Sequence, residues 1–262
     1  MATSLQAARL HLERAVSIEF DTQRRNKDGS ATHDMVALVR SRDRLEERLR
    51  IGVNDLARSR AETLHRLVLA GEYRDYETAQ HTERVGRDAA RLAATLGLSQ
   101  SFVKLIGEAA PLHDVGKIGI PDSILLKPGK LSADEFATMK EHTVLGSTLL
   151  AGSDCELLRL AGQIALTHHE RWNGEGYPSG LSGDSIPIAG RIVAVVDAVD
   201  AMTHVRPYKS ASTFEEALSE ISRCSGSHFD PRMVRAFRRL GRHATVGSTE
   251  DSDQIFELLT AS

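Results

Sequence analysis

The sequence predicts an all-α protein, a helical bundle with an N-terminal helical extension. Apolar residues recur at helical spacing through most of the 262-residue chain. Signals for helix starts precede several of these stretches, among them the Ser132 to Glu135 capping box and the Asp230-Pro231 pair. One run, residues 188–204, resembles a buried strand in its Val and Ile content, but its length and alanine content favour a buried helix.

The N-terminal extension contains two predicted helices. Residues 4–20 and 33–70 carry apolar stripes, and the polar stretch 21–32 separates them as a loop. Gly71 is the expected C-cap of the second helix. The leucines of that helix recur at loosely heptad-like spacing, which Gly52 interrupts. Two interpretations of residues 33–70 therefore stay open, a helix that forms a homodimer and a helix that packs on the downstream domain.

The rest of the chain reads as a succession of helices. Ser99 starts one of them, and Pro111 is expected to bend it near its end. A loop rich in Gly and Pro is expected over residues 173–190, and a polar tail from residue 241. The predicted helices are residues 75–97, 99–114, 132–150, 154–170, 188–204 and 230–240.

Composition limits the classes of function. The formal net charge is −3 and aromatic residues make up 5%, so nothing indicates a nucleic-acid polymer as ligand. Cys155 and Cys224 lack a zinc-finger spacing, which favours two free thiols in a reducing compartment. No apolar run approaches the roughly 20 residues of a membrane span, and the N-terminus lacks the pattern of a secretory signal. We therefore expect a cytoplasmic protein without a membrane segment.

Histidines and carboxylates recur at positions from which they can share metal ions. Glu77 and His81 are four residues apart, so a helix presents both on one face. His113 and Asp114 are neighbours, which suits a carboxylate that bridges two metals better than chelation of one. Lys117, close behind them, is a cation that can bind phosphate. Taken alone, each pair is explained by a solvated helix surface or a polar helix terminus as well as by a metal site.

Further candidates lie downstream. His142, within a capped helix, and His168-His169, near a helix end, are individually explained by packing or capping. Asp197 and Asp200 lie in an apolar run, where an unpaired carboxylate is costly to bury, so each needs a cationic partner. Because these residues occupy the polar positions of successive predicted helices, together they indicate a metal-dependent phosphohydrolase. A shell of His and carboxylates without thiolates suits Fe, Mn or Zn, and such metals can activate water against a phosphate ester.

Several motifs follow one another along the chain: His113-Asp114 with Gly116-Lys117, His142, the run from His168 through Gly176-Tyr177-Pro178, Asp197, Arg206-Pro207-Tyr208-Lys209 and Phe229-Asp230-Pro231. In this order they resemble an HD-GYP domain, the branch of the HD phosphohydrolase superfamily that degrades the bacterial second messenger cyclic di-GMP. The resemblance implies an HD-superfamily helical bundle with metals at its centre. It divides the chain into an N-terminal signalling or dimerisation region (1–66), the HD-GYP domain (67–240) and a polar tail (241–262).

The resemblance also implies roles for individual residues. Asp114 would bridge two metals and act with Lys117 in catalysis. Lys117, Arg206 and Lys209 would contact the substrate phosphates, and Tyr177 would either pack on a guanine or anchor its loop. The chain resembles the family variant in which a Glu is a ligand associated with a third metal. The implied metal ligands are Glu77, His81, His113, Asp114, His142, His168, His169 and Asp197.

The implied activity is hydrolysis of cyclic di-GMP to pGpG, with GMP as a further product. A hydroxide that bridges two of the two or three divalent metals, Fe or Mn, would attack the phosphorus in line and expel the 3′ oxygen. Two alternatives stay open. One is a cyclic di-GMP receptor with little turnover, whose output passes through residues 33–70 to a signalling partner. The other is an HD phosphohydrolase for another nucleotide, such as a different cyclic dinucleotide.

Overall fold

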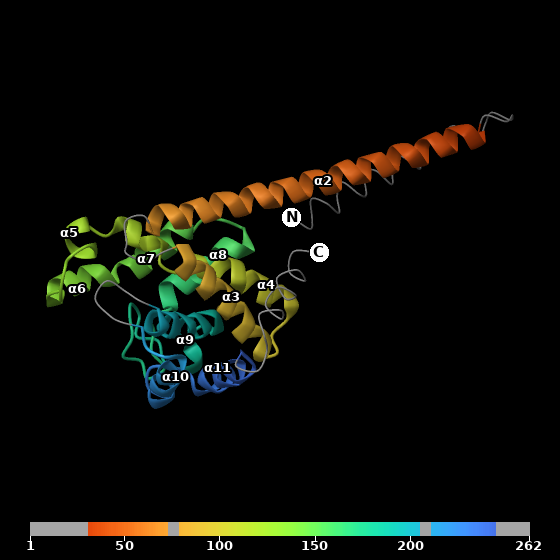
Figure 1. The fold of residues 1–262 in the computed structure, drawn as a ribbon. Coiled ribbons are helices and arrows are strands. Elements are labelled where there is room, and N and C mark those ends of the chain that lie inside the picture. Colours follow the sequence, from red (N-terminus) through yellow and green to blue (C-terminus); the bar gives the residue numbers. More distant parts are fainter. Residues whose placement is uncertain (1–30, 73–78, 205–210, 245–262) are drawn as a thin grey trace. The chain divides into compact units, whose positions relative to one another are not determined.

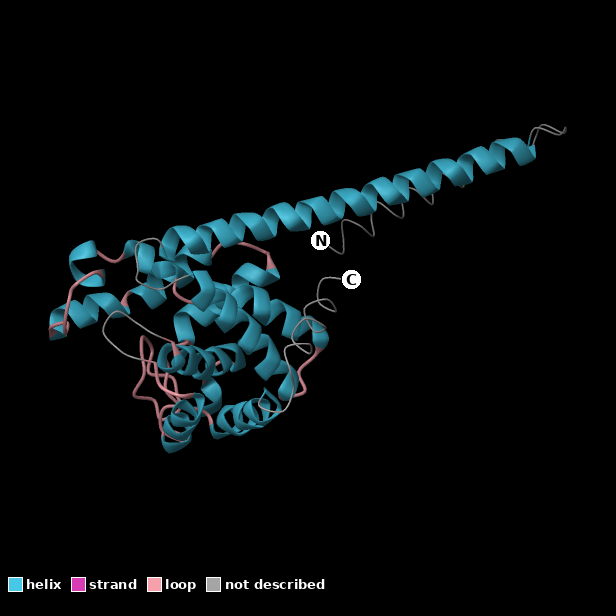
Figure 2. Ribbon diagram, in the orientation of Figure 1, coloured by secondary structure: helices cyan, strands magenta, loops and turns pink. Residues whose placement is uncertain are grey.

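The computed structural model describes residues 31–72, 79–204 and 211–244, and these are helices joined by loops (Figure 2). No strand occurs within these ranges, where extended backbone pairs at two isolated bridges, Asn173 with Ser182 and Ser225 with Phe229. The chain divides into two compact units, Met1–Glu62 and Thr63–Ser262. The all-α prediction is therefore confirmed for the part of the chain that the structure describes.

The described part of the first unit belongs to α2 (Ala31–Glu72), a helix of 42 residues whose last turns belong to the second unit. Several of its apolar side chains are exposed, including Leu45 at 48%, Leu49 at 53% and Leu56 at 58%. Among the described helices, α2 included, none is both long enough and apolar enough to cross a membrane.

The second unit is a bundle of helices that follow one another in the order drawn in Figure 1. Short 3-10 segments connect some of them. The elements are α3 (Ala79–Thr95), α4 (Gln100–Ala109), η1 (Ala110–Leu112), η2 (Val115–Gly119), α5 (Asp122–Leu125), α6 (Ala133–Lys140), α7 (His142–Leu150), α8 (Glu156–Thr167), η3 (Gly183–Ser185), α9 (Ile188–Thr203), α10 (Phe214–Arg223) and α11 (Pro231–Ala244).

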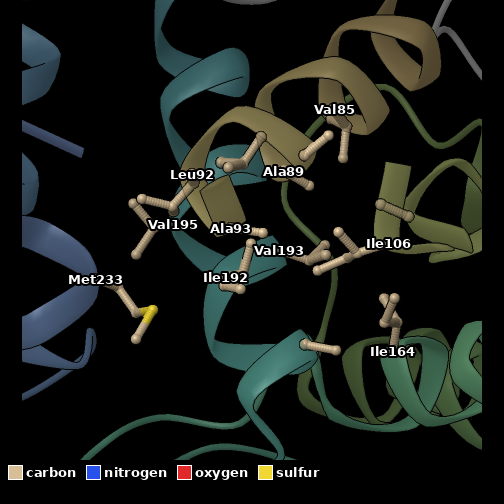
Figure 3. Packing of buried hydrophobic residues seen from close by; sticks show 14 of the residues in the cluster. Val85, Ala89, Leu92, Ala93, Ile106, Ile164, Ile192, Val193, Val195 and Met233 are labelled. Atoms are coloured by element: carbon tan, nitrogen blue, oxygen red, sulfur yellow. The ribbon is translucent and has the colours of Figure 1, made fainter. Parts of the chain in front are cut away.

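Helix α9 lies within the core of this bundle. Its Ile192 and Val193 are fully buried, and the core cluster that contains them also contains Leu92 of α3, Ile106 of α4 and Met233 of α11 (Figure 3). A helix that is apolar on most sides must be covered by neighbouring helices. Each such aliphatic side chain contributes about 1.5–3 kcal/mol when fully buried. The preference for a buried helix over a strand in this run is thus confirmed.

A close contact between glycines brings the segment after α4 against α7. Pro111 ends the α-helix, because proline lacks a backbone N–H, and the chain continues as η1 and η2. Gly116 of η2 faces Gly146 of α7 so closely that a Cβ at position 116 would collide with the Gly146 backbone and the His142 carbonyl oxygen. The absence of a side chain here lets the turn that carries Asp114 approach the start of α7.

Several predicted boundaries are wrong. The helix expected over 132–150 is two helices, α6 and α7, and at the break between them His142 Nδ1 bonds the Met139 carbonyl at 2.7 Å. Gly71 lies in the last turn of α2 instead of following it, and α11 continues to Ala244 into the predicted tail. Helices α5 and α10 were not predicted, although Thr213 and Glu216 form a capping box at α10. The predictions for residues 4–20, most of 21–32 and the tail from 245 lie outside the described residues.

Candidate metal centre

Two groups of ligand-type side chains meet inside the second unit. One group consists of Asp114, His142, His168 and His169, and the other of His81, His113 and Asp197. Within each group, one donor atom from every residue lies within 4.8 Å of the others. The residues come from α3, the turn between η1 and η2, the start of α7, the end of α8, and α9. All predicted metal ligands other than Glu77 therefore lie in these two groups.

The Asp114 carboxylate lies between the two groups. Its Oδ1 is 3.2 Å from His142 Nε2 and 3.4 Å from His168 Nε2, both in its own group. Its Oδ2 is 3.4 Å from His113 Nε2 in the other group, where Asp197 Oδ1 lies 3.5 Å from His81 Nε2. One carboxylate thus directs one oxygen toward each group, which is the arrangement of a ligand that bridges two metals.

The imidazole rings are oriented by bonds on the side away from the centre. The Nδ1 atoms of His113, His142 and His168 bond backbone carbonyls of Ala110, Met139 and Ala165 at 3.0, 2.7 and 3.0 Å. This leaves each Nε2 directed inward, the pattern by which proteins hold histidine ligands of a metal.

The centre contains buried polar atoms that a metal would satisfy. Asp114 Oδ1, His142 Nε2 and His168 Nε2 are buried and make no hydrogen bond to any described residue. Unsatisfied buried polar atoms are rare and costly, so their convergence indicates a ligand that the protein chain itself does not supply. Imidazole nitrogens and carboxylate oxygens without thiolates fit a divalent metal ion.

The protein environment favours the ionisation states that bind metal. Burial opposes the charge on Asp114, but the Lys117 ammonium and the His113 imidazole outweigh it and hold the pKa of this carboxyl well below its usual value. Burial lowers the pKa of both His168 and His169, which keeps both rings neutral. An ionised carboxylate and neutral imidazoles are the forms that coordinate a cation.

Two of the predicted substrate contacts border the centre. Lys117 Nζ lies 2.8 Å from Asp114 Oδ2. The Tyr177 ring lies 4.8 Å from the His169 ring, centroid to centroid, and 6.3 Å from the ring of Phe136. Burial and the Asp114 charge raise the pKa of the Tyr177 phenol, so it stays protonated. Glu77, Arg206 and Lys209 lie outside the described residues.

The loop that carries Tyr177 is held by a residue to which the sequence assigned no role. The Glu170 side chain is buried, and its carboxylate accepts hydrogen bonds from the backbone N–H groups of Ser179 at 2.7 Å and Leu181 at 3.0 Å. Gly176 packs against the Glu170 and Arg171 backbone with no room for a side chain. The signal in the sequence was a carboxylate directly after two candidate ligands, His168-His169, but periodicity did not indicate which way it pointed.

Comparison with known proteins identifies relatives for this region. Residues 72–233 match the family described as HD domain. A cyclic di-GMP phosphodiesterase of Thermotoga maritima is 51% identical over 193 residues, 74% of this chain and 52% of that protein. The 3′3′-cGAMP-specific phosphodiesterase 2 of Vibrio cholerae is 46% identical over 180 residues, 69% of this chain and 34% of that protein.

A solved structure shares the fold. The cyclic GMP-AMP specific phosphodiesterase V-cGAP3 of V. cholerae matches with a TM-score of 0.55 at 21% identity, over 76% of this chain and 53% of that chain. At this identity the likeness concerns the fold alone. The chain spans about half the length of the Thermotoga relative, and a third of the Vibrio relative at 46% identity.

Proposed function

Because the chain belongs to the HD domain family, we propose that it is a metal-dependent phosphodiesterase that hydrolyses cyclic di-GMP to pGpG, with GMP as a further product. The observation that carries the proposal is the pair of buried ligand groups with the Asp114 carboxylate between them and Lys117 beside it. The 51% identical Thermotoga relative, which is named a cyclic di-GMP phosphodiesterase, supports the choice of substrate.

The proposed metal ligands are the two groups together with Glu77, and the metals are Fe or Mn. His142, His168 and His169 would hold one metal, His81, His113 and Asp197 the other, and Asp114 both. When bound, the metals would lower the pKa of a water molecule and stabilise charge on the phosphoryl oxygens. We further propose Glu77 as a ligand of a third metal. Elemental analysis tests this, because two metals per chain in both the wild type and Glu77→Ala would contradict it.

The substrate contacts would come from side chains around the centre. Lys117, which in the structure pairs with Asp114, would transfer its hydrogen bond to a phosphate oxygen and stabilise the charge that develops there. Arg206 and Lys209 would bind the phosphates as well. Tyr177, which is protonated and lies next to His169, would contact a guanine base of the substrate bound beside the metals.

The test of the proposed function is direct hydrolysis. The full chain, purified anaerobically and loaded with Fe(II) or Mn(II), should convert cyclic di-GMP to pGpG, and Asp114→Asn should not. Chromatography of the nucleotides over hours provides the measurement. Intact cyclic di-GMP with the metal-loaded wild type would refute the proposal.

Two other functions give different outcomes in the same assay. A receptor would bind cyclic di-GMP tightly without product, whether or not metal is present. A phosphodiesterase for another cyclic dinucleotide is favoured by the 46% identity with a 3′3′-cGAMP-specific enzyme. Competition among cyclic di-GMP, 3′3′-cGAMP and cyclic di-AMP would distinguish an enzyme for another cyclic dinucleotide from a cyclic di-GMP phosphodiesterase, because the preferred substrate is consumed first.

We also propose that residues 67–240 form the catalytic domain and residues 1–66 a signalling region that dimerises through α2. An α-helix rises about 1.5 Å per residue, so α2 is about 63 Å long. Leu38, Leu45, Leu49 and Leu56 lie along one side of it, and the last three are about half exposed. A second copy of the same helix would cover this stripe, although Arg42 and Gly52 interrupt a regular heptad seam.

A further inference from the structure

The Asp200 carboxylate contacts Nδ1 of His81, on the edge of the ring opposite the proposed metal centre. Asp200 Oδ2 is 2.6 Å from His81 Nδ1, while His81 Nε2 faces Asp197 on the other side of the ring. The Asp200 side chain is 6% exposed, and it belongs to neither ligand group. Asp200 therefore contacts a proposed metal ligand without itself facing the proposed metal.

Arg84 holds this carboxylate in place. Its Nε lies 2.5 Å from Asp200 Oδ1 and its Nη2 lies 2.9 Å from Oδ2, which makes a two-pronged ion pair. Burial opposes ionisation of Asp200, but Arg84 and His81 outweigh it and lower the pKa of the carboxyl. Since Arg84 follows His81 by three residues, α3 presents the ring and the arginine on one face. Helix α9 likewise supplies both Asp197 and Asp200.

His81 differs in this respect from three other histidines of the centre. His113, His142 and His168 direct Nδ1 at backbone carbonyls, which are neutral. A carboxylate at the same position carries a full negative charge. It accepts the Nδ1 proton, keeps the lone pair on Nε2, and makes that nitrogen a stronger donor to a cation.

We propose that Asp200 is a positioning residue that, held by Arg84, selectively strengthens metal binding by the group of His81, His113 and Asp197. The inference rests on the proposed metal centre and goes beyond its ligand set. Loss of a partner of this kind reduces metal affinity by about 10–100-fold. The reduction should fall on this group and leave the group of Asp114, His142, His168 and His169 nearly unchanged.

The experiment is a metal titration of the full chain without nucleotide. Metal-free wild type and Asp200→Asn are titrated with Mn(II) against a fluorescent chelator, which resolves two classes of site. Asparagine keeps the shape and one acceptor oxygen but loses the charge. We expect one class to weaken by about 10–100-fold in Asp200→Asn, and the other to change less than about threefold.

A double-mutant cycle assigns the weakened class to His81. In a His81→Ala background, Asp200→Asn should add no further loss, because the ring through which Asp200 acts is gone. Asp184→Asn is the matched control, since Asp184 is likewise a carboxylate held by arginine, here Arg191 and Arg232, but it lies on the surface. It should bind Mn(II) as the wild type does.

Three outcomes would overturn the inference: unchanged binding by folded Asp200→Asn, equal weakening of both classes, or a full additional loss in the His81→Ala background. The melting temperature of the metal-free proteins shows whether each variant is folded. If Asp200→Asn does not fold, Arg84→Gln replaces it, because this variant leaves His81 and Asp200 in place and should weaken the same class. The proposed function can fail separately, since wild type could bind two metals in this way and still leave cyclic di-GMP intact.

Discussion

Lys117 and Asp114 form an ion pair at the edge of the proposed metal centre. Asp114 is proposed as a metal ligand, and Lys117 as a contact to the substrate phosphate. Both oxygens of Asp114 face histidine nitrogens, whereas the Lys117 ammonium contacts one of these oxygens from outside the two groups. A mutation of Lys117 should therefore separate substrate binding from metal binding.

Lys117→Gln should keep its metals and lose activity. Removing one preorganised donor to a developing phosphoryl charge costs about 10²–10³-fold in rate. Steady-state hydrolysis of cyclic di-GMP and elemental analysis of the same sample provide the measurement. Lys127→Gln is the control, because Lys127 pairs with Glu135 away from the ligand groups. Loss of metal together with activity would assign Lys117 to the metal site instead.

At the scale of elements, the approach of η2 to α7 depends on a position that no side chain can occupy. Gly116→Ala should destabilise the protein by about 1–3 kcal/mol, the usual cost of overpacking. Thermal unfolding should show a fall of about 2–4 °C for each kcal/mol in a domain of this size. Gly52→Ala is the control, because an added Cβ there meets no atom and α2 gains helix propensity. Equal melting temperatures for the two variants would contradict the close contact.

The exposed stripe on α2 gives a second prediction at this scale. Leu49→Asp should convert a dimer to a monomer, because it places a charge in the proposed seam. Ile51→Asp is a matched control: Ile51 is 48% exposed against 53% for Leu49, but lies about 200° further around the helix. Light scattering after size-exclusion chromatography measures the mass of each variant. A monomeric wild type, or equal disruption by both substitutions, would exclude a dimer through this face.

For the whole molecule, the metal centre joins helices that are distant in the sequence, so metal binding and folding should be coupled. A ligand that binds the native state alone at 100 times its Kd stabilises that state by about 2.7 kcal/mol. We expect the melting temperature to rise with added Mn(II) and to fall again with EDTA. Asp114→Asn should lose most of this response, since one substitution alters both groups. A wild-type melting temperature that changes with neither Mn(II) nor EDTA would contradict the coupling.

The sequence predicted most of the helices, because periodicity and capping are local signals. Ser99 and the Ser132 capping box lie where they were expected, whereas Pro111 ends the helix that it was expected to bend. The break before His142 was missed because helix periodicity reports neither the close approach of η2 nor the bond from the His142 ring to the Met139 carbonyl, both of which occur there. Helix α10 was missed even though its capping box was readable in the sequence.

Residue types and spacing indicated a shared metal site, because metal chemistry limits the donors and helical faces limit their directions. The resemblance to HD-GYP domains then implied the ligand set that includes His81, His113, Asp114, His142, His168, His169 and Asp197. The tertiary structure decided how they divide into two groups, and that Asp114 lies between them. It also assigned Asp200, whose burial called for a cation, to Arg84 and His81. These pairings cross 116 and 119 residues of chain. A helical pattern defines which face of a helix is polar, but the partner on that face is set by packing between helices.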